Sequence, residues 1–276
     1  MEGIIILALK RDSYACGAAN LAMSIKYYNP NIHITLVTDN THLKSYRLEH
    51  FSNFDTIKEM NICDYTGIDG FCPAKAKLNI YKYSSSEKIL YVDADSLVLQ
   101  DLKPLFDKLS GSEFKSNVIE GYTQWIGQEY YKDFFGFDYG LTLNSSWFYW
   151  ENDKVFKLAN EFYNKGLDKS KMFQKWGGTL CDEVFFNASI TKLGINVRLD
   201  KEIMFFGNVI DPRTLDQLQE EYCAFTLYGG GKGVTTVRDN YIAWYDKLLF
   251  KIWESKGFEH RFKAYHLLQG KHVSNK

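Results

Sequence analysis

The stretch KILYVDADSLVL, Lys88 to Leu99, decides how the rest of the chain is interpreted. Ile89–Val92 is an unbroken apolar and aromatic run, which predicts a strand buried on both faces, as in a parallel sheet. Asp93 and Asp95 follow at the carboxyl end of that strand, where open α/β sheets bind their ligands. Two carboxylates one residue apart can hold a divalent cation, and that cation can hold phosphate oxygens. A turn with two solvated aspartates is the alternative.

The composition indicates a folded α/β protein of ordinary surface charge. The chain has 276 residues, of which 45% are hydrophobic, and its net charge is −1. This length and apolar content predict a substantial core, and the chain shows no linker, so we interpret residues 1–276 as one domain. The near-neutral charge argues against a domain whose whole surface binds nucleic acid.

The cysteines and the apolar runs predict a cytoplasmic protein. Five cysteines are scattered without a C-x-x-C spacing, which favours reduced thiols over a disulfide framework or a zinc site. The N-terminal apolar run is short and has no basic lead-in, so it does not resemble a signal peptide. No apolar run is long enough for a membrane span, and we therefore expect none.

The order of expected elements builds a parallel sheet around the opening stretch. Gly3–Leu9 predicts a strand, Tyr14–Tyr28 a helix and Ile32–Val37 a second strand, which together form a β-α-β unit with a right-handed crossover. A helix over Ala74–Tyr83, which carries Lys77, leads into the central strand. Further elements are predicted later in the chain: helices over 41–50, 155–165, 182–193 and 241–255, and strands near 57, 141–150 and 195–199.

Several short motifs accompany the paired aspartates in a recognisable order. They are Tyr14-Ala15-Cys16-Gly17 after the first strand, Lys77-Leu78, Leu143-Asn144-Ser145-Ser146, Cys181-Asp182-Glu183, and a late His266 followed by Gly270 and Lys271. This pattern resembles the glycogenin-like members of the retaining nucleotide-sugar glycosyltransferases, glycosyltransferase family eight. The resemblance runs from about residue 4 to residue 272 and is closest around Tyr91–Leu99.

The resemblance implies a single Rossmann-like GT-A domain with a mostly parallel central sheet flanked by helices. It divides the chain into a nucleotide-binding half, residues 1–105, and a half for the donor sugar and the acceptor, residues 106–276. It also implies a Mn²⁺ or Mg²⁺ site on the donor diphosphate, formed by Asp93, Asp95 and His266. The implied nucleotide contacts come from Leu7, Ala8, Tyr14, Lys77, Ala94 and Lys271, and the implied contacts at the transferred sugar come from Asn144, Asp182 and Glu183.

The chain departs from the family pattern in three places. Ser146 stands where the family usually has glycine, and Glu183 stands where it usually has glutamine. The tail lacks the usual Pro-Trp and has changed spacing after His266, so His272 is an alternative third metal ligand. The second acid at Glu183 leaves both a retaining and an inverting outcome open. Asp182 and Glu183 also have a purely structural alternative, because acids at a helix start complement its dipole.

The favoured hypothesis is therefore a Mn²⁺-dependent glycosyltransferase that uses a nucleotide sugar, with UDP the expected nucleotide. The acceptor stays open among a glycan, a protein and a nucleic acid. A haloacid-dehalogenase-like phosphatase, with Asp93 as its nucleophile, is a second hypothesis, because its motif also places two aspartates after an apolar strand. A non-catalytic nucleotide- or carbohydrate-binding relative is the third.

Overall fold

The structure is a computed structural model, and it describes residues 1–10, 12–39, 52–67, 70–118, 128–137, 143–165, 181–198, 204–206 and 215–226. The helices expected over 41–50 and 241–255 lie outside the described residues, as do His266, Lys271 and His272. These parts of the sequence analysis therefore stay predictions.

The chain divides into two compact units, and each is built from segments that are separated in sequence. Unit 1 contains Met1, Met60–Tyr91 and Leu109–Leu199. Unit 2 contains Glu2–Glu59, Val92–Lys108 and Asp200–Lys276. The chain therefore passes repeatedly from one unit to the other.

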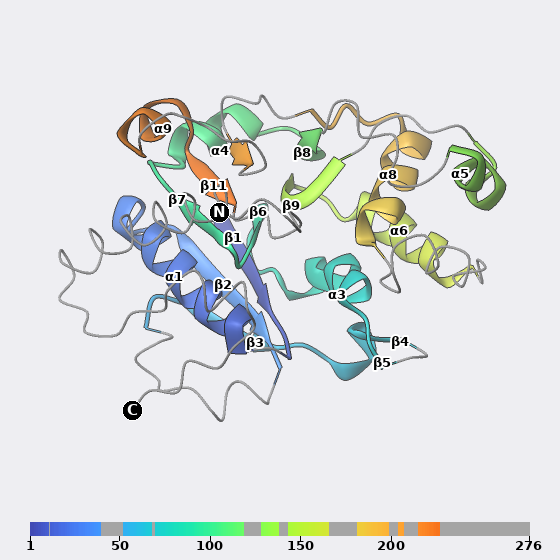
Figure 1. The fold of residues 1–276 in the computed structure, drawn as a ribbon, viewed down its shortest axis with the longest axis horizontal. Coiled ribbons are helices and arrows are strands. Elements are labelled where there is room, and N and C mark those ends of the chain that lie inside the picture. The colour runs from blue at the N-terminus through green and yellow to red at the C-terminus, as the bar shows by residue number, and fades with distance from the viewer. Residues whose placement is uncertain are drawn as a thin grey trace, which may run out of the picture. The chain divides into compact units, whose positions relative to one another are not determined.

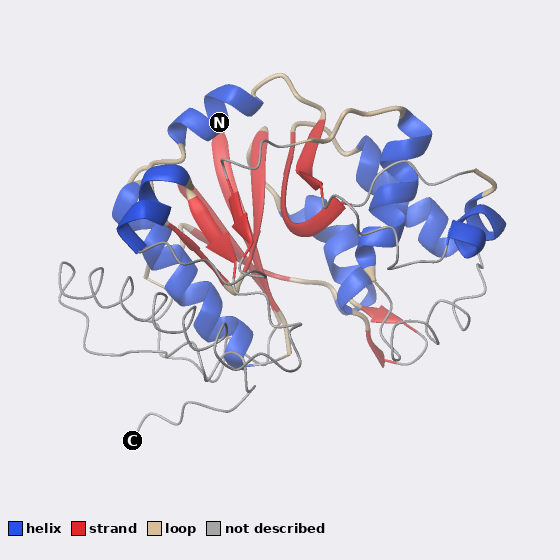
Figure 2. Ribbon diagram, turned by 45° about the horizontal axis from the view of Figure 1, so that its top comes forward, coloured by secondary structure: helices blue, strands red, loops and turns tan. Residues whose placement is uncertain are grey.

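Unit 2 begins with the predicted β-α-β unit. Strands β1 (Glu2–Ala8), β2 (His33–Thr38) and β3 (Thr56–Glu59) are parallel neighbours, and α1 (Asp12–Tyr28) connects the first two. The strand β1 carries three consecutive isoleucines that are at most 1% exposed, which is the burial expected of a strand covered on both faces. Helix α1 packs against β1 and β7 (Figures 1 and 2).

The rest of unit 2 is assembled from short elements. Strands β10 (Met204–Phe206), β11 (Ala224–Thr226) and β7 (Ser96–Val98) form a three-stranded sheet in that order. β11 pairs parallel to β10 and antiparallel to β7. Helix α4 (Lys103–Leu109) follows β7, and helix α9 (Leu215–Glu221) directly precedes β11.

The segment of unit 1 that begins at Met60 starts with short elements. It contains the 3₁₀ turn η2 (Ile62–Asp64) and the small antiparallel hairpin β4 (Thr66–Gly67) and β5 (Gly70–Phe71). Helix α3 (Pro73–Asn79) follows, with proline at its first position, and it continues as the 3₁₀ turn η3 (Ile80–Tyr83). The predicted single helix over 74–83 is therefore an α-helix with a tighter last turn.

The second part of unit 1 has an aromatic core. It contains β8 (Phe114–Val118), α5 (Gln128–Phe135), β9 (Leu143–Trp150), α6 (Lys154–Asn164) and α8 (Asp182–Leu193). Phe114, Phe148, Phe156 and Phe186 are fully buried, and their ring centroids lie between 5.4 and 6.0 Å apart. One ring comes from each of β8, β9, α6 and α8, so this cluster joins the antiparallel pair β8 and β9 to both helices.

Strand β6 (Lys88–Asp93) is the strand predicted from the opening stretch, and its residues Ile89–Val92 are buried. The strand order is β3-β2-β1-β6-β9-β8, with β8 and β9 antiparallel. A mostly parallel sheet flanked by helices is thereby confirmed. Among the described residues, none of the helices combines the length and apolar character that crossing a bilayer requires.

The predicted strand at 195–199 is wrong over its described part, which reaches Arg198. This segment forms only an isolated parallel bridge between Arg198 and Ser116, supported by the Ser116 N–H donating to the Val197 carbonyl at 2.8 Å. The register of β8 against β9 shifts between Ser116 and Asn117. Such a shift disrupts a ladder locally, and it lies at the same residue, Ser116, that forms the single bridge to Arg198.

Candidate functional site

The paired aspartates of unit 2 lie where the sequence placed them. Asp93 is the last residue of β6, Ala94 and Asp95 form a turn, and Ser96 opens β7. Asp93 and Asp95 are partly exposed, whereas Ala94 is 6% exposed and Ser96 is fully buried. The hydroxyl of Ser96 hydrogen-bonds that of Thr226 at 2.8 Å, which ties β7 to β11. The two aspartates are thus the partly exposed residues of an otherwise buried turn, and the Oδ1 atom of Asp95 is itself buried.

The end of β1 and the start of α1 hold the residues expected to meet the nucleobase. Ala8 is buried at the end of β1, and Leu7 before it is partly exposed. Tyr14 lies in the first turn of α1 with 40% of its surface exposed. In the strand order β1 lies between β2 and β6. Helix α1 connects β1 to β2 on one side, and β6, which ends at Asp93, lies on the other side. Ligands of open α/β sheets bind at such a switch point.

The loop after β1 shows a feature that the sequence analysis did not identify. Lys10 has a φ of 67°, an uncommon conformation for a residue with a side chain. Its backbone N–H donates to the carboxylate of the buried Asp39 at 2.8 Å, and its Nζ pairs with the same oxygen at 3.7 Å. Asp39 follows β2, and an acid directly after a parallel strand was the available signal. Asp39 thus fixes the loop that leads into α1.

In unit 1, Lys77 and Glu183 meet at the backbone of Ser145. The Lys77 ammonium donates to the Ser145 carbonyl at 3.2 Å and to its hydroxyl at 3.3 Å. It also lies 5.3 Å from the centroid of the Tyr91 ring. The Ser145 N–H donates to Glu183 Oε1 at 3.0 Å, and the Cys181 thiol lies 3.4 Å from Oε2. The structure therefore brings together three motifs that are far apart in sequence.

The charge of Glu183 depends on this environment. Burial raises the pKa of Glu183 to about 7, and the neighbouring Asp182 carboxylate acts in the same direction. The Ser145 N–H and the positive charge of Lys77 oppose that rise in pKa. Burial, with help from Glu183 and Asp182, raises the pKa of the Cys181 thiol well above its ordinary value. The site therefore favours the neutral form of Glu183 more than water does, and it keeps the Cys181 thiol protonated.

Asn144 and Asp182 occupy the ends of two neighbouring elements of unit 1. Asn144 is 3% exposed, and its side-chain oxygen accepts from the Ser146 N–H at 2.8 Å. Asp182 is the first residue of α8, the helix that packs against β9. Asn187 of the same helix accepts from the Leu143 N–H at 3.0 Å, which holds the start of β9 to α8. Asn144 is thus fixed by its own strand, and Asp182 is partly exposed at the helix start.

The residues of the turn fit a hard divalent cation, although a third protein ligand is not among those described. Asp93 and Asp95 offer carboxylate oxygens at this turn, the donors that Mg²⁺ and Mn²⁺ prefer. Over the described ranges, no cluster of three His, Cys, Asp or Glu side chains could hold a metal ion. A cation held by one or two carboxylates usually completes its shell with waters and substrate phosphates. His266 and its alternative His272 stay predictions.

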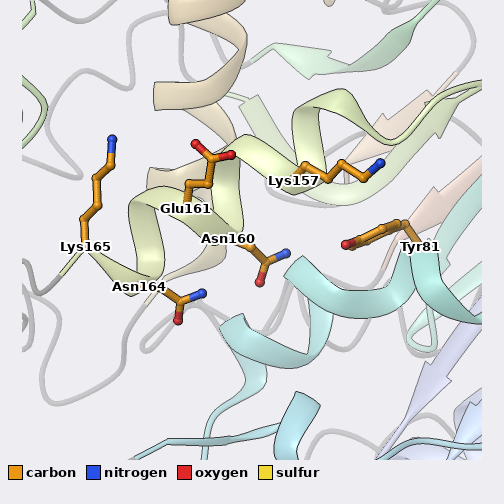
Figure 3. Close-up of a pocket in the computed structure, with 6 residues that line it drawn as sticks. All are labelled: Tyr81, Lys157, Asn160, Glu161, Asn164 and Lys165. Atoms are coloured by element: carbon orange, nitrogen blue, oxygen red, sulfur yellow. The ribbon is translucent and has the colours of Figure 1, made fainter.

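A separate pocket of about 490 Å³ opens on α6 in unit 1 (Figure 3). Tyr81 of η3 lines it, and the other lining residues are Lys157, Asn160, Glu161, Asn164 and Lys165. The Asn160 amide donates to the carbonyls of Leu78 at 2.7 Å and Phe156 at 3.0 Å, so it joins α6 to α3. None of the residues predicted for the site lines this pocket.

Solved structures share this fold, although sequence comparison does not find relatives. No protein-family model and no curated protein match the chain. The galactosyltransferase LgtC, solved with donor and acceptor sugar analogues, matches with a TM-score of 0.57 at 16% identity, over 97% of this chain and 100% of LgtC. The bifunctional glycosyltransferase WbbM matches with a TM-score of 0.57 at 14% identity, over 91% of this chain and 51% of WbbM.

The glycosyltransferase GlyE of Streptococcus pneumoniae TIGR4 matches with a TM-score of 0.53 at 13% identity. That match covers 93% of this chain and 64% of GlyE. The chain therefore shares its fold with glycosyltransferases.

Proposed function

We propose that this protein transfers a sugar from a nucleotide-sugar donor, with UDP as the nucleotide, to an acceptor. The observation that carries the proposal is the pair of partly exposed aspartates, Asp93 and Asp95, at the end of strand β6 beside the sheet's switch point. The fold shared with glycosyltransferases supports it. The acceptor is a glycan, a protein or a nucleic acid.

The reaction exchanges one bond at the anomeric carbon of the sugar. The bond from this carbon to the diphosphate oxygen breaks, and its electron pair leaves with the nucleoside diphosphate. An acceptor oxygen forms the new bond on the same face, in a retaining outcome, and releases its proton. Negative charge therefore grows on the departing diphosphate while positive charge grows on the sugar ring.

The donor's diphosphate is the part that unit 2 would bind. Asp93 and Asp95, with His266 as the proposed third ligand, would hold a Mn²⁺ or Mg²⁺ ion. That ion would offset the charge of the leaving diphosphate. Leu7, Ala8 and Tyr14 would position the nucleobase, because the exposed ring of Tyr14 offers a stacking surface at the start of α1. Ala94 would contribute its backbone, and Lys271 would meet the phosphates.

The transferred sugar is the part that unit 1 would meet. Asp182 and Glu183 stand at the start of α8, where a carboxylate could stabilise a sugar with oxocarbenium character. Asn144 would hydrogen-bond a sugar hydroxyl, and Lys77 would offer a positive charge to the donor. In the structure Lys77 donates to the Ser145 carbonyl, and the Ser145 N–H donates to Glu183. A shift in the position of Ser145 would therefore change the hydrogen bonds of both charged residues.

Calorimetry of UDP binding tests the metal assignment. We expect the wild-type protein to bind UDP with Mn²⁺ and to lose that binding in EDTA. Asp95→Asn should bind UDP no better with Mn²⁺ than with EDTA, because a neutral amide is a much weaker ligand for a hard cation. Asp107→Asn is the matched control, since Asp107 is an exposed carboxylate of α4 whose ion-pair partner is Lys103. Metal-dependent binding that survives in Asp95→Asn would show the assignment to be wrong.

Turnover then separates the proposed function from the alternatives. A transferase should slowly hydrolyse one member of a panel of nucleotide sugars when acceptor is absent. Phosphatase activity that Asp93→Asn abolishes, without nucleotide-sugar turnover, would instead identify Asp93 as a phosphoryl nucleophile. Tight, metal-dependent UDP binding with no hydrolysis of any donor would identify a non-catalytic binding protein.

A further inference from the structure

We propose that Gly17, a residue inside helix α1, sets the position of the Asp93-Ala94-Asp95 turn and so tunes how tightly that turn binds a cation. The proposal rests on the proposed function for its cation, but its structural part concerns contacts within unit 2 alone. Gly17 would be a positioning residue, since it reaches the ligand only through the backbone of Ala94.

The first observation is how closely the helix approaches the turn. A Cβ atom added at Gly17 would lie 2.4 Å from the Ala94 carbonyl oxygen and 3.2 Å from its carbonyl carbon. The obstructing atoms belong to backbone, which cannot rotate away as the end of a side chain can. Gly17 is therefore required for the present separation of α1 from the turn.

The second observation is that nothing else explains a glycine at this place. Gly17 lies six positions into a 17-residue helix, where glycine costs about 1 kcal/mol relative to alanine. Positive φ does not explain it, because the positive-φ glycines of the described chain are Gly70, Gly111, Gly136 and Gly194. The close approach to Ala94 is the remaining role, and it offsets the cost in helix propensity.

The third observation is that α1 is anchored to the chain that follows the turn. Ser24 Oγ accepts from the Val98 N–H at 3.1 Å, and Asn29 Oδ1 accepts from the Leu102 N–H at 2.8 Å. The Asn29 amide also donates to the Gln100 carbonyl at 3.3 Å. Gly17 and Ser24 of α1, and Asn29 directly after that helix, therefore meet the segment from Ala94 to Leu102 in the same order along both segments.

These contacts determine which part would yield to an added methyl group. Helix α1 is held by Ser24 and Asn29 and by its packing on β1 and β7. Ala94 and Asp95 form a turn between two strands. We therefore expect the turn to yield rather than the helix, and its displacement would move both carboxylates that flank Ala94. Mg²⁺ demands near-ideal octahedral geometry, and oxygen sites of that geometry also suit Mn²⁺, so a shift of a few tenths of an ångström would weaken binding.

The test compares Gly17→Ala with Ser24→Ala, a change in the same helix that removes an anchor without touching the turn. In Gly17→Ala we expect the Mn²⁺ concentration that half-saturates UDP binding to rise by about tenfold or more, the loss typical when support behind a metal ligand is removed. In Ser24→Ala we expect thermal stability to fall and the Mn²⁺ requirement to stay within about twofold of wild type, since only a hydrogen bond remote from the ligands is lost.

Hydrogen exchange measured without metal or nucleotide gives a second readout. Overlapping peptides that cover residues 92–98 should exchange faster around Asp95 in Gly17→Ala, and around Val98 alone in Ser24→Ala. Unchanged exchange at the turn together with an unchanged Mn²⁺ requirement in Gly17→Ala would overturn the proposal. If wild-type protein binds UDP without metal, the proposed cation site fails, while the exchange comparison still decides whether Gly17 positions the turn.

A double variant covers the case in which Gly17→Ala does not fold. Adding Ala94→Gly gives the turn the freedom to move away from the new methyl group. We expect this protein to fold and to keep the raised Mn²⁺ requirement, with Ala94→Gly alone as its control. If the double variant needs no more Mn²⁺ than Ala94→Gly for half-saturation of UDP binding, the proposal is also overturned.

Discussion

Glu183 is a carboxyl group whose pKa the surrounding residues raise toward neutrality. Its two oxygens are engaged by the Ser145 N–H and the Cys181 thiol, and Lys77 lies on the other side of Ser145. A carboxyl group with a pKa of about 7 can exist in either form under ordinary assay conditions. A change of buffer pH can therefore change the protonation of Glu183 without any mutation.

The raised pKa of Glu183 predicts a specific dependence of stability on pH. The unfolded chain ionises this group near its ordinary value of 4.5, and the folded protein ionises it near 7. Between those values the folded state binds the extra proton, so the stability contributed by Glu183 falls as pH rises and stays low above 7. We expect the Tm of Glu183→Gln minus that of wild type to be more positive at pH 8 than at pH 5.

The expected pH effect on the free energy of unfolding is on the order of 2 to 3 kcal/mol, at about 1.4 kcal/mol per pH unit. Lys77→Met is the companion variant, because Lys77 lowers the pKa of Glu183. Removing that charge should move the titration of the Glu183 carboxyl, followed by carbon-13 NMR, to higher pH. A difference in Tm between Glu183→Gln and wild type that is the same at both pH values would contradict this account.

At the scale of elements, the stretch after β7 is held by Asn29, the residue directly after α1. Asn29 directly follows α1, is 8% exposed, and contacts the backbone at Gln100 and Leu102. The Leu102 N–H would be left buried without its acceptor in Asn29→Ala. An unsatisfied buried donor costs about 1 to 3 kcal/mol in addition to the lost bonds.

We therefore expect Asn29→Ala to lower the free energy of unfolding by about 2 to 3 kcal/mol in urea denaturation. Asn31→Ala is the matched control, because Asn31 is exposed two residues further along, and its effect should stay within about 0.5 kcal/mol. Equal effects of the two substitutions would mean that the bonds from Asn29 do not hold this stretch.

Elements with strong periodicity could be predicted from the sequence, and elements that depend on a distant partner could not. The isoleucine run of β1, the apolar spacing of α1 and the buried run of β6 each carry their signal locally. Strands β10 and β11 have only three residues each. β11 pairs with β7, more than 100 positions earlier, and β10 pairs with β11, so neither strand carries its own signal. The segment at 195–198 has a local strand pattern but forms no strand, because it pairs with a neighbour at only one bridge.

At the scale of the whole molecule, the motif order proposes residues for the candidate site but does not contain the contacts among them. Asp93, Asp95, Lys77 and Asp182 each have a described position, and their roles stay predictions. The contacts that Ser145 makes with Lys77 and Glu183 span 68 and 38 residues and join three elements, so no local pattern contains them. Gly17 was visible only as part of a motif, since its role depends on a distance to Ala94.

The interleaving of the two units has a consequence for synthesis of the protein on the ribosome. The segments of unit 1 are complete once Leu199 has been made, whereas unit 2 still awaits Asp200–Lys276. Until Thr226 emerges, β7 has no β11 to pair with, and the hydroxyl of Ser96 has no partner from that strand. An unpaired strand edge readily joins another chain. The nascent protein is therefore most exposed to misassembly late in translation, with the strand that follows its paired aspartates still waiting for its partner.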